Sequence, residues 1–240
     1  MIENRHILAT VVAAGAEKGL VKRSFREVGG RSLLEIAINS VLGSKYIDQI
    51  VVATDDSETE SFCKTRNISV RTDLLYDHPD MMVRTDKCGM KSAQIFSSFD
   101  YILILDIGYP LRIASDIDRV LELCHRNSGL PVLTVSDTEI APQELHYLTG
   151  ERGMLSVFPK MDESAAVSRK LYKTAYSSLV ASREYLEQCG TYFGEKSQAY
   201  LLPRERAFRV ESKADLSIAD SLFQKTGSGY FPAAAQSQKS

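Results

Sequence analysis

The sequence lacks the motifs and compositional biases that would assign a function at once. It contains neither a G-x-x-x-x-G-K-[ST] phosphate loop nor a G-x-G-x-x-G dinucleotide turn. The net charge is only −2, from 29 basic and 31 acidic residues that are interspersed, so nothing points to a nucleic-acid partner. The 4 cysteines form no C-x-x-C pair, which argues against a zinc knuckle or a dithiol redox site and fits reduced thiols.

Histidine clusters and membrane signals are also missing. The 4 histidines are far apart and form no H-x-x-x-H pair, so each is expected at the surface or in packing. The N-terminal segment has a charged start and only a short apolar stretch before Lys18, which fits neither a secretory signal nor a membrane span. We therefore expect a cytoplasmic protein without membrane or nucleic-acid partners.

The N-terminal region joins an apolar run to a basic loop. Residues 7–13 (Ile-Leu-Ala-Thr-Val-Val-Ala) are typical of a strand buried on both faces. The loop that follows contains two glycines and three cations: Gly15, Gly19, Lys18, Lys22 and Arg23. Small residues let backbone N–H groups approach an anion, and cations neutralise a polyphosphate, so the pattern is consistent with a phosphate site. An ordinary solvated turn is the alternative.

Strand-like and helix-like patterns then alternate along the chain. Further buried strands are predicted at residues 47–54, 68–71, 101–105 and 130–135. Amphipathic helices are predicted at residues 31–44, 58–66, 86–98 and 115–127. This alternation predicts one three-layer, Rossmann-like α/β domain with a mostly parallel, mixed sheet. A chain of 240 residues with 44% hydrophobic content can bury such a core.

The periodicity weakens after residue 137. Residues 137–170 are interrupted by prolines and glycines and predict short extended pieces or an arm. Strands near 172–180, 199–202 and 207–210 and helices from Ser182 and over 213–224 are expected beyond it. Residues 226–240 are rich in Gly, Ser, Ala and Gln and predict a disordered tail, which leaves a single domain at 1–225.

Two acidic residues, Asp55 and Asp56, follow the strand predicted at 47–54. Open α/β sheets place ligands at the carboxyl ends of their strands, so both side chains could face the same crevice as the first loop. The alternative is that Asp56 or Ser57 caps the helix that follows.

Four stretches carry a more specific pattern: AAGAEKGLVKRS at 13–24, GGRSLLEIAI at 29–38, IVVATDD at 50–56 and ILDIGYPLR at 104–112. In the same order they resemble A-R-G-G-S-K-G-I-P-x-K-N, G-G-K-P-L-I-x-x-T-I, V-x-V-S-T-D-D and L-L-Q-P-T-S-P-L-R of the acylneuraminate cytidylyltransferases. That family activates sialic acids and related nonulosonates as CMP-sugars. The resemblance runs from residue 6 to residue 224.

The chain departs from the family pattern at chemically important positions. The family's loop arginine falls on Ala14, or on Ala13 if the loop is shifted by one, and its strand-end glutamine falls on Asp106. Its metal-binding D-I-D falls on Arg209-Val210-Glu211, where a cation replaces one carboxylate. The charged residues that remain at or near family positions are Lys18, Arg23, Asp55, Asp56, Arg71, Arg112, Glu211 and Asp215.

The resemblance implies a nucleotide-diphospho-sugar transferase type of fold and the transfer of CMP from CTP to a nonulosonic or related sugar acid, with release of pyrophosphate. It implies that Lys18 and Arg23 are catalytic. The nucleotide-binding residues that it implies are Ala13, Gly15, Lys18, Arg23, Arg71 and Asp106. It implies Mg²⁺ held by Glu211 and Asp215, and a homodimer in which residues 137–180 reach the second subunit.

The replaced residues leave other hypotheses open. Arg209 could compete with a metal for Glu211, or could itself contact the triphosphate. A relative that binds a nucleotide, a sugar or a partner protein without turnover is the main alternative. A different nucleotide-sugar chemistry, with Asp55 and Asp56 holding a divalent metal, is the third.

Overall fold

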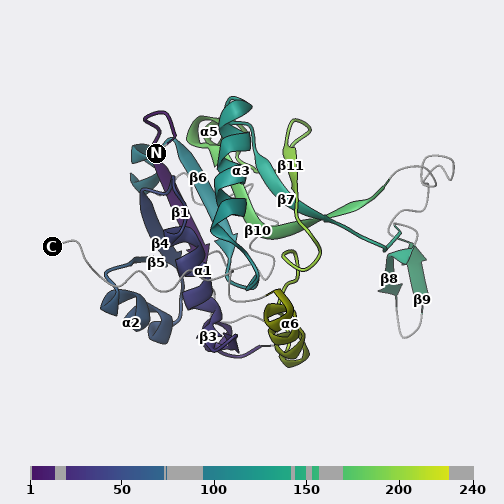
Figure 1. Cartoon of the computed structure of the whole chain (residues 1–240). Coiled ribbons are helices and arrows are strands. Elements are labelled where there is room, and N and C mark those ends of the chain that lie inside the picture. Colours follow the sequence, from purple (N-terminus) through teal and green to yellow (C-terminus); the bar gives the residue numbers. More distant parts are fainter. Residues whose placement is uncertain are drawn as a thin grey trace.

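The computed structural model describes residues 2–13, 20–72, 94–141 and 170–226, together with Leu74 and the short segments 144–149 and 153–156 (Figure 1). Gly15 and Lys18 of the basic loop lie outside the described residues, as does the predicted tail after Thr226.

A mixed sheet of seven strands forms the centre of the molecule, in the order β11-β7-β10-β6-β1-β4-β5 (Figure 1). Its strands are β1 (Ile7–Val12), β4 (Gln49–Ala53), β5 (Ser69–Arg71), β6 (Tyr101–Asp106), β7 (Val132–Asp137), β10 (Tyr172–Ser182) and β11 (Gln198–Leu201). All neighbouring pairs are parallel except those of β10, which runs antiparallel to β6 and β7. The predicted mostly parallel, mixed sheet is confirmed.

Helices cover both faces of this sheet. They are α1 (Leu33–Leu42), α2 (Ser57–Thr65), α3 (Ala114–Arg126), α5 (Arg183–Cys189) and α6 (Lys213–Thr226), with 3-10 turns η1 (Arg23–Phe25) and η3 (Gln94–Ser98). Along β1, alternate side chains enter different cores: Ile7 packs with residues of α1, α2 and α3, and Leu8 packs with residues of η3 and α5. The three-layer arrangement is therefore the one that the strand–helix alternation predicts.

An arm extends from one side of the sheet. The hairpin of β8 (His146–Thr149) and β9 (Gly153–Ser156) lies away from the layers, beyond β7 and β10 (Figure 1). A second hairpin, β2 (Glu27–Val28) and β3 (Arg31–Ser32), precedes α1. No helix in the described segments is long and apolar enough to cross a membrane.

The predicted strand at 207–210 is wrong. Residues 207–210 form no strand; the Val210 N–H donates a hydrogen bond of 2.8 Å to the Gly108 carbonyl. Ala207 and Val210 are buried because this irregular segment packs beside the end of β6, and that burial explains its apolar residues. The predicted helix at 86–98 also differs, because its described part, residues 94–98, is a 3-10 turn.

Candidate active site at the carboxyl ends of the strands

The carboxyl ends of β1, β4, β5 and β6 meet at one edge of the sheet because these strands are parallel. Val12 pairs with Asp106, so Ala13 and the end of β6 are neighbours. Asp55 follows β4, and Arg71 is the last residue of β5. Four of the sequence-predicted positions therefore share the edge at which open α/β sheets place ligands.

Asp106 is the centre of an ion cluster at this edge. Its Oδ1 accepts a hydrogen bond of 2.8 Å from the Gly108 N–H and lies 3.3 Å from Arg23 Nη2. Its Oδ2 accepts a hydrogen bond of 2.9 Å from Arg209 Nε. Arg23, Asp106 and Arg209 are separated by more than eighty positions in sequence, and the fold brings them into one contact.

Local backbone features bring the side chain of Arg23 into contact with Asp106. Lys22 adopts the left-handed conformation, with φ of 54°, and turns the chain into η1, so that Arg23 points into the sheet edge. The guanidinium lies where a side chain at position 108 would be, because a Cβ on Gly108 would overlap Arg23 Nη2. Arg23 is only 1% exposed as a result, so its charge is buried beside Asp106 and held away from solvent.

The cluster keeps Asp106 ionised. Burial by itself would raise the pKa of Asp106, but the guanidinium groups of Arg23 and Arg209 and the Gly108 N–H together lower it below its ordinary value. Burial lowers the pKa of Arg23 despite the neighbouring carboxylate. An ionised, buried carboxylate between two guanidinium groups results.

Arg209 also joins Asp106 to Glu211, since its Nη1 donates to Glu211 Oε1. Asp215 is occupied in another way: its Oδ2 accepts hydrogen bonds from the N–H groups of Glu211, at 3.0 Å, and of Ser212, at 2.7 Å. The Asp215 N–H donates back to Ser212 Oγ at 3.3 Å. This is a reciprocal cap at the start of α6. Burial would raise the pKa of Asp215, but these hydrogen bonds lower it.

The carboxylates present do not fit a magnesium site in this arrangement. Mg²⁺ takes hard oxygen ligands in near-octahedral geometry, usually one or two carboxylates with waters and phosphate oxygens. Here Arg209 pairs with both Asp106 and Glu211, and Asp215 caps a helix. Within the described segments, no three His, Cys, Asp or Glu side chains come close enough to hold a metal ion.

Two large side chains occupy the space beside the cluster. Tyr109 is 3% exposed, and its hydroxyl accepts a hydrogen bond of 2.9 Å from the Tyr176 N–H. Arg112 is buried, donates to the Asp106 carbonyl at 2.5 Å and to Ser177 Oγ at 3.2 Å. Burial lowers the pKa of Arg112 to about 10, so the side chain stays protonated at neutral pH. A third guanidinium thus belongs to this end of β6.

One of the two acidic residues that follow β4 has a structural role. Asp56 caps α2, with its Oδ2 accepting a hydrogen bond of 2.8 Å from the Thr59 N–H. Hydrogen bonds from Thr59, first from its hydroxyl, lower the pKa of Asp56. The capping alternative is therefore the one that the structure shows, while Asp55 is exposed at the same edge.

Two residues complete the site beyond those that the resemblance implies. For Arg209, a pairing with Glu211 and a contact with the triphosphate were both considered from the sequence, but its contact with Asp106 has no sequence signal. Gly108 gave no signal either, although its missing side chain makes room for Arg23. Among the implied site residues, Arg23 contacts Asp106 directly, and Arg209 links Asp106 to Glu211. Ala13 and Arg71 lie at the same edge of the sheet.

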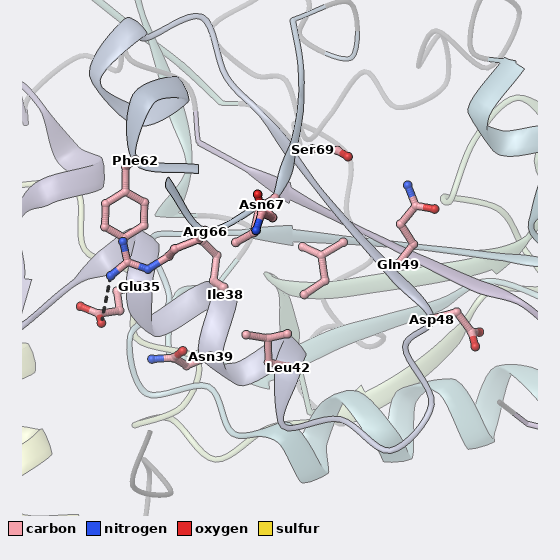
Figure 2. Close-up of a pocket in the computed structure, with 12 residues that line it drawn as sticks. Glu35, Ile38, Asn39, Leu42, Asp48, Gln49, Phe62, Arg66, Asn67 and Ser69 are labelled. Atoms are coloured by element: carbon pink, nitrogen blue, oxygen red, sulfur yellow. Dashed lines mark ion pairs between the residues drawn. The ribbon is translucent and has the colours of Figure 1, made fainter. Parts of the chain in front are cut away.

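A groove of about 750 Å³ lies at the opposite end of the sheet (Figure 2). Asp48 and Gln49 line it at the start of β4, and Asn67 and Ser69 line it at the start of β5. Figure 2 shows Arg66 between Phe62 and Glu35: its Cζ lies 3.8 Å from the Phe62 ring centroid, and Nη2 lies 3.8 Å from Glu35 Oε1. This groove and the charged cluster are therefore different places, and the cluster carries the groups suited to phosphate chemistry.

Comparisons with known proteins agree with the sequence resemblance. Residues 11–73 match the family model described as Cytidylyltransferase. Post-translational flagellin modification protein B of Campylobacter coli is 24% identical over 230 residues, or 91% of this chain and 95% of that protein. The 2-C-methyl-D-erythritol 4-phosphate cytidylyltransferase of Rhodococcus jostii is 27% identical over 227 residues, or 91% and 96%. CMP-N,N'-diacetyllegionaminic acid synthase of Campylobacter jejuni is 23% identical over 225 residues, or 90% and 94%.

A solved structure supports the fold over nearly the whole chain. CMP:2-keto-3-deoxy-manno-octonic acid synthetase complexed with CTP superposes with a TM-score of 0.65 and 13% identity, covering 92% of this chain and 99% of that chain. The nucleotide-diphospho-sugar transferase type of fold is confirmed, and the resemblance to the cytidylyltransferases is confirmed at low identity.

Proposed function

We propose that this chain, which resembles the cytidylyltransferases at low identity, transfers CMP from CTP to a nonulosonic, sialic-acid-like, or related sugar acid and releases pyrophosphate. The observation that carries this proposal is the cluster of Arg23, Arg112 and Arg209 around Asp106 at the carboxyl end of β6. Arg209, whose side chain is 31% exposed, is suited to hold phosphates and to stabilise the charge that develops when pyrophosphate leaves, and the buried Arg23 and Arg112 add positive charge beside it.

The implied site residues take distinct roles in this proposal. Lys18 contacts the phosphates directly, and Gly15 and Ala13 leave room for the nucleotide beside the end of β1. Arg71, at the end of β5, lies on the base side. Arg23 is buried behind Asp106, so it acts by fixing the charge and position of that carboxylate rather than by touching the substrate.

Relatives leave two acceptor classes to separate. The names of two proteins in the comparisons indicate sugar acids as acceptors, and another name indicates 2-C-methyl-D-erythritol 4-phosphate. A sugar acid offers a hydroxyl next to a carboxylate, whereas the second acceptor offers a phosphate. The panel of acceptors in the test must therefore contain both.

The test measures pyrophosphate release from each nucleoside triphosphate with a panel of nonulosonic acids and 2-C-methyl-D-erythritol 4-phosphate, with and without Mg²⁺ or Mn²⁺. We expect release with CTP and a sugar acid. Lys18→Ala should lose about 1.5–3 kcal/mol of phosphate binding, or roughly ten- to a hundredfold in CTP affinity. Lys64→Ala is the matched control, because Lys64 pairs with Glu60 at 2.6 Å on the exposed surface of α2.

Binding without turnover is the second candidate function. Tyr109 fills space at the end of β6, and Arg209 neutralises the carboxylates that would hold a metal. These features favour a chain that retains a nucleotide site but not the chemistry. Calorimetric binding of CTP together with no pyrophosphate release from any acceptor would establish this candidate and overturn the catalytic one.

A homodimer is part of the proposal, and the exposed apolar side chains of the arm support it. Ile140, Leu145, Leu155 and Tyr172 are between 43% and 56% exposed on or beside the hairpin of β8 and β9. Exposed apolar side chains concentrated on one arm favour an interaction site there. Sedimentation at micromolar protein should give a dimer, and Leu155→Ser should shift it toward monomer; a parent that sediments only as a monomer would contradict the dimer.

A further inference from the structure

The metal ligands that the resemblance implies are replaced here by a guanidinium-centred arrangement. Both oxygens of Asp106 are engaged: Oδ1 by the Gly108 N–H and Arg23, and Oδ2 by Arg209 at 2.9 Å. Asp106 is 2% exposed. A divalent cation could reach it only by displacing Arg209, which at the same time pairs with Glu211.

The local charge favours an anion over a second cation. Three guanidinium groups lie at this end of β6. Arg23 and Arg209 pair with the Asp106 carboxylate, Arg209 also pairs with Glu211, and Arg112 donates to the Asp106 backbone carbonyl. The nearby carboxylate of Asp215 accepts hydrogen bonds from the N–H groups at the start of α6. The guanidinium of Arg209 attracts the oxygens of a triphosphate and repels Mg²⁺.

Accessibility distinguishes the members of the cluster. The side chain of Arg23 is 1% exposed, but those of Arg209 and Glu211 are 31% and 59% exposed. A solute can therefore reach the guanidinium of Arg209 at the side where Glu211 now binds it. Guanidinium binds phosphate oxygens bidentately, and exchange of one anionic partner for another leaves Arg209 bound to Asp106 throughout.

We infer that this chain binds the triphosphate of CTP without a divalent cation, with Arg209 exchanging Glu211 for a phosphate oxygen. The inference rests on the proposed function, since it concerns how the same site takes CTP. It assigns to Arg209 the charge-neutralising role that the family resemblance gives to Mg²⁺.

Isothermal titration of CTP into the full chain tests it, once with EDTA and once with Mg²⁺. The affinities in the two buffers should agree within about threefold. Arg209→Met should weaken binding by roughly ten- to a hundredfold in both buffers. Arg5→Met is the matched control, because Arg5 forms an exposed pair of 2.9 Å with Asp100 at the other end of the sheet.

Glu211→Gln is a second test, because it should change CTP affinity in opposite directions depending on whether Glu211 competes with phosphate or binds a metal. Glu211 is exposed, so the substitution leaves the fold intact. If Glu211 competes with phosphate for Arg209, its neutralisation tightens CTP binding in EDTA. If Glu211 is a metal ligand, the same change weakens binding, and only when Mg²⁺ is present.

The outcomes separate the inference from the function on which it rests. Equal binding in both buffers, with loss in Arg209→Met, supports the inference. Binding only with Mg²⁺, or metal-free binding that Arg209→Met leaves unchanged, overturns the inference and leaves the proposed function standing. No CTP binding in either buffer overturns both.

Discussion

The two ends of the parallel strands differ in both shape and charge. At the carboxyl ends, Asp106 and Arg23 are almost completely buried and form ion pairs with one another and with Arg209. At the amino ends, an open groove carries Glu35 and Arg66, whose side chains are 37% and 45% exposed and 3.8 Å apart. The groove and the buried ion pairs therefore lie at different ends of the same strands, so concavity and buried charge do not coincide in this sheet.

Removing the central carboxylate should have the largest effect. In Asp106→Asn, the buried cation of Arg23 loses its counter-charge, so we expect a loss of about 3–5 kcal/mol of unfolding free energy. Glu35→Gln, at the groove, should cost about 0–1 kcal/mol because its pair is exposed. Urea unfolding at neutral pH measures both. Equal losses of unfolding free energy in Asp106→Asn and Glu35→Gln would contradict the view that the ion pairs at the two ends of the strands differ in strength.

Lowering the pH should reduce the difference in unfolding free energy between the parent and Asp106→Asn. The pKa of Asp106 is lowered in the folded state, so its contribution to stability is present above the ordinary Asp pKa of about 3.9 and is lost as the pH falls through the lowered folded value. Other carboxylates with lowered pKa values, such as Asp56 and Asp215, are present in both proteins and cancel. The difference in unfolding free energy between the parent and Asp106→Asn, measured by urea unfolding at a series of pH values, should therefore decrease below about pH 4. A difference that stays constant down to acid unfolding would show that Asp106 is not ionised in the cluster.

Filling the space over Gly108 should have an intermediate effect. A Cβ there would overlap Arg23 Nη2 and lie 3.3 Å from Arg209 Cγ, so Gly108→Ala should cost about 1–3 kcal/mol through overpacking. Gly43→Ala is the control near the amino ends, where a Cβ would lie 3.1 Å from Ala114 Cβ; its change should stay within about 1 kcal/mol. Thermal unfolding of both variants measures the difference. A neutral Gly108→Ala would mean that Arg23 is not held in place.

Altering the groove should have the smallest effect. Arg66→Met keeps most of the apolar contact with Phe62 but removes an exposed cation–π contact of about 0.5–1 kcal/mol and a weak ion pair. CTP affinity should not change, and calorimetry tests this. A clear loss of CTP binding in Arg66→Met would place the nucleotide in the groove.

Much of the fold could be predicted because the sheet strands are buried on both faces. Runs such as residues 7–13 and 101–105 have no polar alternation, and both are central strands within a residue of the predicted bounds. The strand predicted at 207–210 failed for the same reason that the others succeeded: burial of Ala207 and Val210 gives an apolar pattern whether or not a neighbouring strand accepts their hydrogen bonds.

The candidate site was less predictable because its contacts are long-range. Sequence indicated that Arg23 and Asp106 matter, but not that each neutralises the other across the end of β1, nor that Arg209 binds both Asp106 and Glu211. One feature was readable and was missed: Ser212 and Asp215 are spaced as a capping box before the helix at 213–226. That spacing predicts a helix cap for Asp215 before it predicts a metal ligand.

The most direct test of the account is hydrogen–deuterium exchange of the parent chain with and without CTP. The account predicts that CTP slows exchange at the carboxyl-end segments, residues 106–112 and 207–212, and leaves residues 35–42 and 66–69 of the groove unchanged. Slower exchange confined to the groove segments would contradict it.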